Sequence, residues 1–176
     1  MATRPSHGRR ARISLRAIIR GWPWYYETAK VVRNEVLLRT VPNGIFYYTK
    51  TMGNWAINPS AFEPAKDDVD GISLFREDFV TPKDLASVNP HPNGVRVARV
   101  FARQFGSLNL SVKPSPDASG PPGHAIVPEL HFVRKTPQTK DLKRKMLDLA
   151  QKLAQFASKN KIYTPQGMSD PIVKKK

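Results

Sequence analysis

The sequence predicts a single α+β domain with a mostly antiparallel sheet, a long C-terminal helix and a basic N-terminal arm that includes a short helix. Three observations favour this class. Sixteen prolines in 176 residues are nearly twice the usual share of about 5 % and argue against a helical bundle. Short runs of branched and aromatic residues between turn residues are typical of strands. Near the C-terminus, one segment repeats its apolar residues at helical spacing.

The N-terminal arm is rich in arginine. Residues 1–10 lack apolar periodicity and contain a proline and a glycine, so we expect them to be disordered in isolation. Residues 11–20 carry an arginine at every fourth position among apolar residues, which predicts a short basic amphipathic helix. We therefore divide the chain into residues 1–21 as arm and helix, 22–165 as one α+β domain, and 166–176 as a basic tail.

The next segments predict strands. Residues 36–41 and 45–50 are rich in branched and aromatic residues and flank a Pro-Asn-Gly turn, so we expect them to form a β-hairpin. An acidic loop at residues 63–71 precedes a predicted strand at 72–75. We expect Gly71 to adopt a positive φ in an Asp-Gly turn. An alternative is that Asp68 or Asp70 pairs with Arg76 or another arginine and fixes this loop.

Further elements follow along the chain. Thr81 followed by a proline has the cap and first position of a short helix. Residues 95–103 predict an edge or half-buried strand with its arginines facing solvent, although a helix is an alternative, and residues 107–112 alternate as a strand does. Residues 124–132 predict a strand that Pro128 interrupts or confines to an edge.

The clearest predicted helix follows Thr136 and Pro137. Its apolar residues recur at spacings of four, three, four and three, namely Leu142, Met146, Leu149, Leu153 and Phe156. We expect this stripe to pack on the sheet, with the lysines and Arg144 turned mostly away from it.

The composition excludes several classes of function. The chain has no cysteine, so disulfides and thiolate zinc sites are ruled out, and we expect no metal and no cofactor. Its apolar runs are far shorter than the ~20 residues of a membrane span. We expect a cytoplasmic protein without a membrane span, with organelle import through residues 1–26 as an open alternative.

The charge distribution points to a polyanionic partner. Residues 1–50 carry 10 basic and 2 acidic side chains, residues 51–100 carry 5 and 7, and residues 101–176 carry 14 and 5. Two basic ends around a nearly neutral middle favour nucleic acid, because each phosphate contact releases counterions. Binding to an anionic membrane surface through the first helix is the weaker alternative.

The expected contacts fall into three sets. We expect phosphate contacts from five arginines of the arm: Arg9, Arg10, Arg12, Arg16 and Arg20. A weaker second patch comprises Lys143, Arg144, Lys159 and Lys161. The candidates for stacking on bases are Trp22 and Trp24. No motif for sequence-specific base readout is present.

These observations predict a non-catalytic accessory subunit that binds nucleic acid within a larger ribonucleoprotein or defence assembly. Structured or single-stranded RNA is favoured, and DNA is the alternative. A larger protein partner is part of this interpretation. A module that binds protein alone is an alternative, and it predicts that removal of residues 1–20 leaves nucleic-acid binding unchanged.

Two stretches, DDVDGISLFR and GHAIVPEL, carry a resemblance to a family. The chain resembles small bacterial proteins that share a DxDGISLxR stretch and a GHAxIPEL stretch, a group without an established activity. The resemblance therefore implies no function. It does suggest that Asp70, Arg76, His124 and Glu129 converge on one pocket.

A second resemblance defines the enzymatic alternative. The strand at residues 36–41 carries Arg39 ahead of such a segment, which resembles ADP-ribosyltransferase-like toxins. On this interpretation the protein is a small toxin or effector enzyme with a pocket around His124. Its catalytic residues would be Arg39, Arg76, His124 and Glu129. His124 is chemically suited to general acid or base catalysis.

Overall fold

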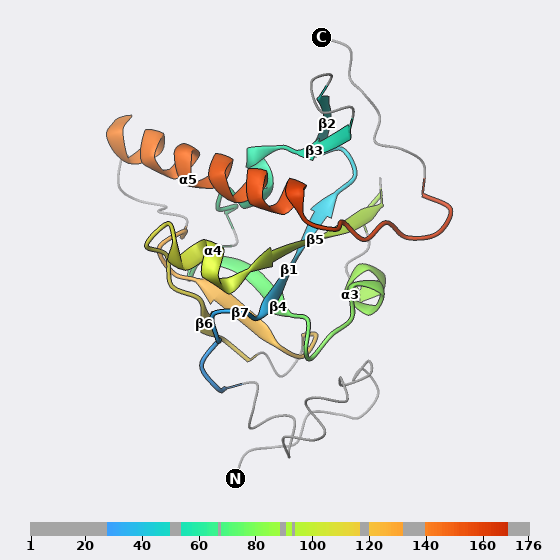
Figure 1. Ribbon diagram of the computed structural model, residues 1–176, viewed down its shortest axis with the longest axis horizontal. Helices are drawn as coiled ribbons and strands as arrows, with labels where there is room; N and C mark the ends of the chain where they lie inside the picture. The colour runs from blue at the N-terminus through green and yellow to red at the C-terminus, as the bar shows by residue number, and fades with distance from the viewer. Residues whose placement is uncertain are drawn as a thin grey trace.

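An antiparallel sheet of five strands, in the order β5-β1-β4-β7-β6, forms the centre of the computed structural model (Figure 1). The structure describes residues 28–49, 54–66, 68–88, 91–92, 94–116, 120–131 and 140–168. The strands of the sheet are β1 (Val36–Pro42), β4 (Ile72–Arg76), β5 (Val95–Phe101), β6 (Lys113–Pro114) and β7 (His124–Val127). The remaining elements are β2 (Phe46–Thr49), β3 (Asn54–Ile57), the 3₁₀ helix η2 (Pro59–Phe62), α3 (Pro82–Val88), α4 (Ala102–Gly106) and α5 (Lys140–Lys159). The predicted α+β class is confirmed.

Strand β1 has a partner on each side because its apolar side chains fill both faces of the sheet. Leu37 and Val41 belong to the large core on one face, and Leu38 belongs to a smaller core on the other. β1 pairs with β5 along its whole length and with β4 at its start. A strand buried on both faces cannot lie at the edge of a sheet facing water.

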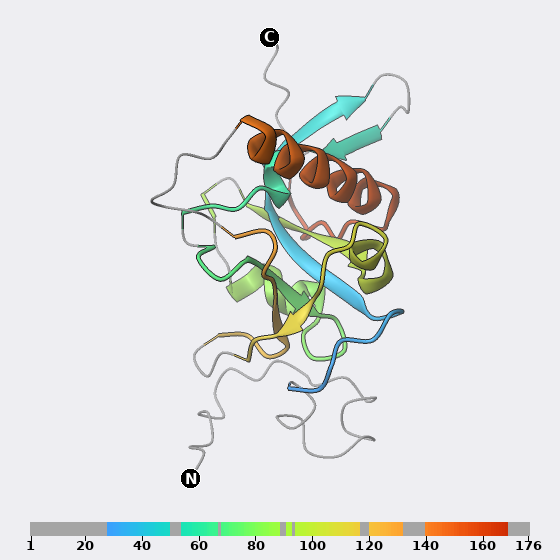
Figure 2. The same cartoon turned by 90° about the vertical axis from the view of Figure 1, so that its left-hand side faces the viewer.

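Helix α5 covers the face with the large core (Figures 1 and 2). Its last three turns bury Ala150, Leu153, Ala154 and Ala157. Of the predicted stripe, Leu153 is buried, Met146 and Leu149 are partly buried against the core, and Phe156 is half-buried outside it, so the predicted packing is confirmed only in part. Leu142 is 41 % exposed, so its predicted place in the core is wrong. The reason is that residues 140–145 are all exposed and the first turns of α5 lie beyond the surface that the sheet offers.

Helix α3 covers the opposite face. Leu85 and Val80 pack there against Leu38 and Val97. The predicted cap is confirmed, because the Asp84 backbone N–H donates to Thr81 Oγ1 at 3.2 Å. The predicted strand at residues 72–75 is confirmed as β4. Of the strand predicted at residues 124–132, only residues 124–127 form a strand, β7, which ends immediately before Pro128 as the predicted interruption requires.

The predicted hairpin between residues 36–41 and 45–50 is wrong. Both segments form strands, but β2 pairs with β3 and β1 pairs within the main sheet. The turn bends the chain out of the sheet: the Ile45 N–H donates to the Pro42 carbonyl at 2.9 Å, while Asn43 is buried and accepts from Arg96. The Pro-Asn-Gly sequence therefore forms a turn, but the two strands that flank this turn do not pair with each other.

Two other predictions need correction. Residues 107–112 are not a strand, although Leu110 is buried and Leu108 and Val112 pack on the same core. The segment 95–103 is strand β5 followed by α4, and Arg96 does not face solvent. Arg96 donates to Asn43 Oδ1 and Thr164 Oγ1, at 2.9 and 2.7 Å, because the chain after α5 runs beside this strand.

One pair of matched substitutions tests how α5 is held. Leu153→Ala removes a fully buried side chain and should cost about 2–5 kcal/mol of unfolding free energy. Leu147→Ala makes the same chemical change at a position that is 50 % exposed, and should cost less than about 1 kcal/mol. Urea denaturation followed by circular dichroism measures both. Equal effects would contradict the placement of this helix.

Candidate functional site

A buried ion pair joins β4 to the segment that precedes β1. The Arg76 Nε donates to Glu35 Oε1, and its Nη2 donates to Oε2 at 3.2 Å. Both residues are almost fully buried. The Nη1 of Arg76 donates to the Ala29 carbonyl at 3.0 Å, and Glu35 Oε2 accepts from the Val32 N–H at 3.1 Å. Together these bonds fix the position of residues 29–35.

The two stretches behind the first family resemblance pair with each other as β4 and β7. The Arg76 N–H donates to the Gly123 carbonyl at 2.9 Å. A Cβ on Gly71, whose φ is +128°, would lie 2.3 Å from the Val127 carbonyl oxygen. The predicted positive φ at Gly71 is confirmed. Several of the residues that define these stretches therefore hold two strands together.

Arg39 is bonded within the fold. It donates to the carbonyls of Ala61 and Ser73, at 3.1 and 2.7 Å, and lies 4.0 Å from an oxygen of Asp68. The predicted pairing of a loop aspartate with an arginine is confirmed. Burial lowers the pKa of Arg39, and the charge of Asp68 opposes that shift. The guanidinium links β1 to η2 and to the acidic loop.

His124 lies on the opposite face of the sheet from Arg76. Its register partner is Phe75, whose ring centroid is 5.3 Å from the imidazole, and successive residues of a strand point to opposite faces. The His124 Nδ1 lies 2.6 Å from the Ser115 carbonyl. Glu129 accepts from the backbone and hydroxyl of Ser111, at 3.1 and 2.6 Å.

The structure therefore does not bring together the four residues of the enzymatic alternative. Each of Arg39, Arg76, His124 and Glu129 is bonded to a different part of the chain. Asp70, which the first resemblance would add to that pocket, is exposed. In the described ranges, no group of three or more acidic, histidine or cysteine side chains is arranged to hold a metal ion.

The first turns of α5 present a cluster of cations, which we call the α5 basic cluster: Lys140, Lys143, Arg144 and Lys145. All four are exposed, and none forms an ion pair with another described residue. By contrast, Lys152 further along α5 pairs with Asp148 at 2.7 Å. Among the described residues, the cluster therefore has no carboxylate paired with it that offsets its charge.

The predicted second patch (Lys143, Arg144, Lys159 and Lys161) does not form one surface, because its members lie at opposite ends of α5. Lys143 and Lys159 are sixteen positions apart, which corresponds to about 24 Å at ~1.5 Å per residue. Lys159 and Lys161 are exposed at the other end of α5. The predicted contacts of the arm, Arg9, Arg10, Arg12, Arg16 and Arg20 with Trp22 and Trp24, lie outside the described residues.

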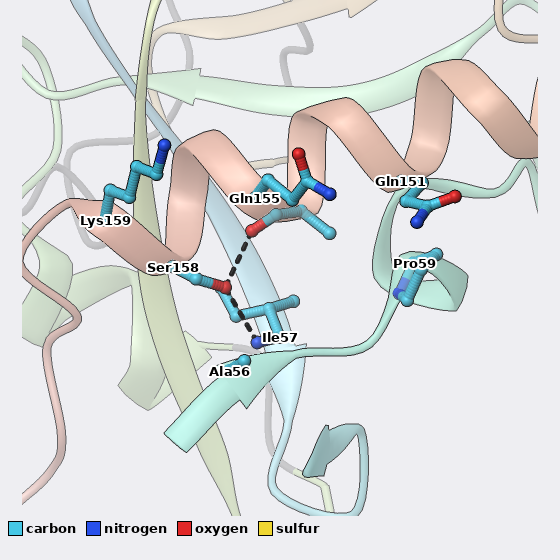
Figure 3. A pocket seen from close by; sticks show the side chains of 8 residues that line it. Ala56, Ile57, Pro59, Gln151, Gln155, Ser158 and Lys159 are labelled. Atoms are coloured by element: carbon cyan, nitrogen blue, oxygen red, sulfur yellow. Dashed lines mark hydrogen bonds between the residues drawn. The ribbon is translucent and has the colours of Figure 1, made fainter. Parts of the chain in front are cut away.

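A cavity of about 310 Å³ lies between α5 and the β3–η2 segment (Figure 3). The Ser158 hydroxyl crosses its base: it accepts from the Ile57 N–H at 2.9 Å and donates to the Ala154 carbonyl at 2.7 Å. Gln151, Gln155 and Lys159 complete its polar lining. Ser158 is thus engaged in joining helix to strand.

Sequence reasoning missed a second concave surface, which we call the basic groove. Its volume is about 760 Å³, and it is lined by residues 30–33, by α4 with Ser107, and by residues 110–112, which we call its floor. Lys30, Arg33 and Arg103 are its cations. Lys30 and Arg33 are three positions apart, but Arg103 follows Arg33 by seventy positions, so no local charge run could have indicated the three together.

No family model matches this chain, and no curated protein or solved structure is significantly similar to it. In the part of the chain that the structure describes, no helix combines the length and apolar character needed to cross a membrane. The case for a function therefore depends on the geometry above.

The close approach at Gly71 gives a prediction about the resemblance stretches. Gly71→Ala places a methyl group against the Val127 carbonyl at a positive φ, and should cost about 2 kcal/mol or more. Gly44→Ala is the control, because no atom lies within 4 Å of the added Cβ. Thermal unfolding measures both. If Gly71→Ala lowers the unfolding temperature no more than Gly44→Ala does, Gly71 does not approach the Val127 carbonyl as closely as the structure shows.

A double-mutant cycle tests the buried ion pair. Arg76→Met or Glu35→Leu alone leaves an uncompensated buried charge and should cost about 3–5 kcal/mol. The double variant removes both charges and should cost clearly less than the sum of the two. Denaturant unfolding supplies the three free energies, and strict additivity would show that the two side chains do not interact.

Proposed function

We propose that this protein is a non-catalytic nucleic-acid-binding subunit that binds RNA in preference to duplex DNA. The observation that carries the proposal is the α5 basic cluster, exposed and without ion pairs to described residues. A partner with regularly spaced phosphates complements such a surface. The formal net charge of +15 acts in the same direction over longer distances.

The use of carboxylates inside the fold supports the proposal. Glu35, Asp68, Glu77 and Asp148 each pair with a cation of the same chain. Arg76, Arg39 and Arg99 are thereby engaged in structure. The cations of the α5 basic cluster have no such partner among the described residues, so an external polyanion would meet less competition there.

The arm extends the proposed interface. In this proposal Arg9, Arg10, Arg12, Arg16 and Arg20 contact phosphates, and Trp22 or Trp24 stacks on an unpaired base. Stacking on exposed bases is what favours single-stranded or looped RNA over a duplex. A role within a larger ribonucleoprotein or defence assembly, in the cytoplasm, completes the proposal.

The salt dependence of binding tests the proposal directly. We expect the full chain to bind a fluorescein-labelled oligouridylate with a log–log salt slope of about −4 to −7, from six to ten contacts at about −0.7 each. Fluorescence anisotropy between low and moderate salt measures the slope. No binding even at low salt would refute the proposal.

A matched pair of charge substitutions localises the interface. Arg144→Gln should weaken binding several-fold and reduce the salt slope by about 0.7, because it removes one phosphate contact. Lys83→Gln removes the same charge from an exposed position on α3, which covers the other face of the sheet, and should change affinity little. Equal reductions in affinity would indicate a response to net charge without a defined site.

A further inference from the structure

We propose that the basic groove binds one nucleotide unit of a single-stranded RNA, with a phosphate against its cations and a base against its apolar floor. The inference rests on the proposed function and gives that function a second, concave binding surface. Its lining contains Lys30, Arg33 and Arg103 and no carboxylate. Charge complementarity therefore favours an anionic occupant.

The cations come from two walls that backbone hydrogen bonds hold together. The Arg103 N–H donates to the Arg33 carbonyl at 2.8 Å, and the Ala102 N–H donates to the Glu35 carbonyl at 3.0 Å. Two exposed arginines are thus held at adjacent backbone positions. A phosphate in the groove would accept charge-assisted hydrogen bonds from both side chains.

The side chain of Arg103 is already oriented. Its guanidinium lies 4.7 Å from the ring centroid of Phe101, and Nη1 lies 3.5 Å from Asn34 Oδ1. Neither contact neutralises the charge, and Arg103 has no ion pair among the described residues. An oriented cation loses less conformational entropy when an anion binds.

The floor of the groove is apolar. Leu110 is buried, and Val31, Ala102 and Val112 pack against the large core while still lining the groove. A volume of about 760 Å³ suits a ligand of nucleotide size, since small-molecule sites measure roughly 300–1,000 Å³. A duplex keeps its bases stacked and paired, so this floor favours an unpaired base.

The described part of the chain begins at residue 28, two residues before Lys30 in the lining of this groove. Lys30 follows Arg20 by ten residues, a length of chain that spans at most about 36 Å. Arginines of the arm repel the cations of the groove and are unsuitable occupants. A single RNA strand seated in the groove lies within reach of those arginines and would neutralise both.

Among the described residues, the carboxylate of Glu129 is hydrogen-bonded to the lining of the groove, and its charge would oppose an anion there. Glu129 accepts two hydrogen bonds from Ser111, which lines the groove. Glu129→Gln keeps an oxygen that can accept those bonds and removes the negative charge. Affinity should therefore rise about two- to threefold, whereas Glu63→Gln, at an exposed position on the loop after η2, should leave it unchanged.

An uncharged obstruction provides the decisive experiment. Gly106 lines the groove, and no atom lies within 4 Å of an added Cβ, so Gly106→Leu should fold normally and occupy the site of the ligand. We expect affinity for a fluorescein-labelled oligouridylate to fall about fivefold or more. Gly44→Leu makes the same change at another open position, outside the groove, and should bind like the unmodified protein.

A charge variant gives an independent measurement if Gly106→Leu is unstable. Arg33→Gln/Arg103→Gln should lower affinity about tenfold or more and reduce the salt slope by about 0.7 for each phosphate that the variant no longer neutralises. If the unmodified protein binds the oligouridylate and these variants bind equally well, the groove is not a binding site while the proposed function stands. If the unmodified protein does not bind at all, both proposals fail.

Discussion

The buried pair of Arg76 and Glu35 is the constraint on which most of this structure depends. An arginine without a partner in this position would cost several kcal/mol, so the segment before β1 must supply a carboxylate and the Ala29 carbonyl. The backbone N–H of Arg76 meanwhile donates to the Gly123 carbonyl, which sets the start of β7 against the end of β4. Arg76 thus holds together three segments that are distant in the chain: its own strand β4, the start of β7, and residues 29–35. Residues 30–33 of the last segment form one wall of the basic groove.

The elements that the sequence predicted correctly are those with a local signal. Thr81 caps α3 through its own side chain, and Pro128 ends β7, so neighbouring residues determine both. The partners of β1 are different, because they depend on β4 and β5, which follow it by many residues. Asn43 shows the difficulty: its turn propensity was visible, but its burial against Arg96 depends on a strand that folds beside it. Leu142 fits the helical period and yet lies beyond the sheet.

The candidate site divides in the same way. The α5 basic cluster could be predicted because its cations are neighbours in sequence and on one helix. The basic groove could not be predicted, because Arg33 and Arg103 are distant in the sequence and are adjacent only in the fold, where their backbones are hydrogen-bonded. The predicted convergence of the four residues of the enzymatic alternative on one pocket could not be judged from the sequence for a related reason. Arg76 and His124 lie on strands that pair with each other, but their side chains point to opposite faces of the sheet. The pairing register decides which face a side chain takes, and no sequence motif specifies that register.

The chemistry of the cations then distinguishes structural from surface roles. Arg39, Arg76 and Arg96 use planar guanidinium groups to bond carbonyls and carboxylates at fixed angles inside the protein, which an ammonium group could not reproduce. Three of the four cations in the α5 basic cluster are lysines, which stay hydrated and place a point charge on a flexible chain. A net charge of +15 opposes compaction. The internal ion pairs reduce the repulsion between cations in the centre of the fold. The unpaired positive charge of the described residues lies at the surface, where a bound polyanion would reduce the remaining repulsion.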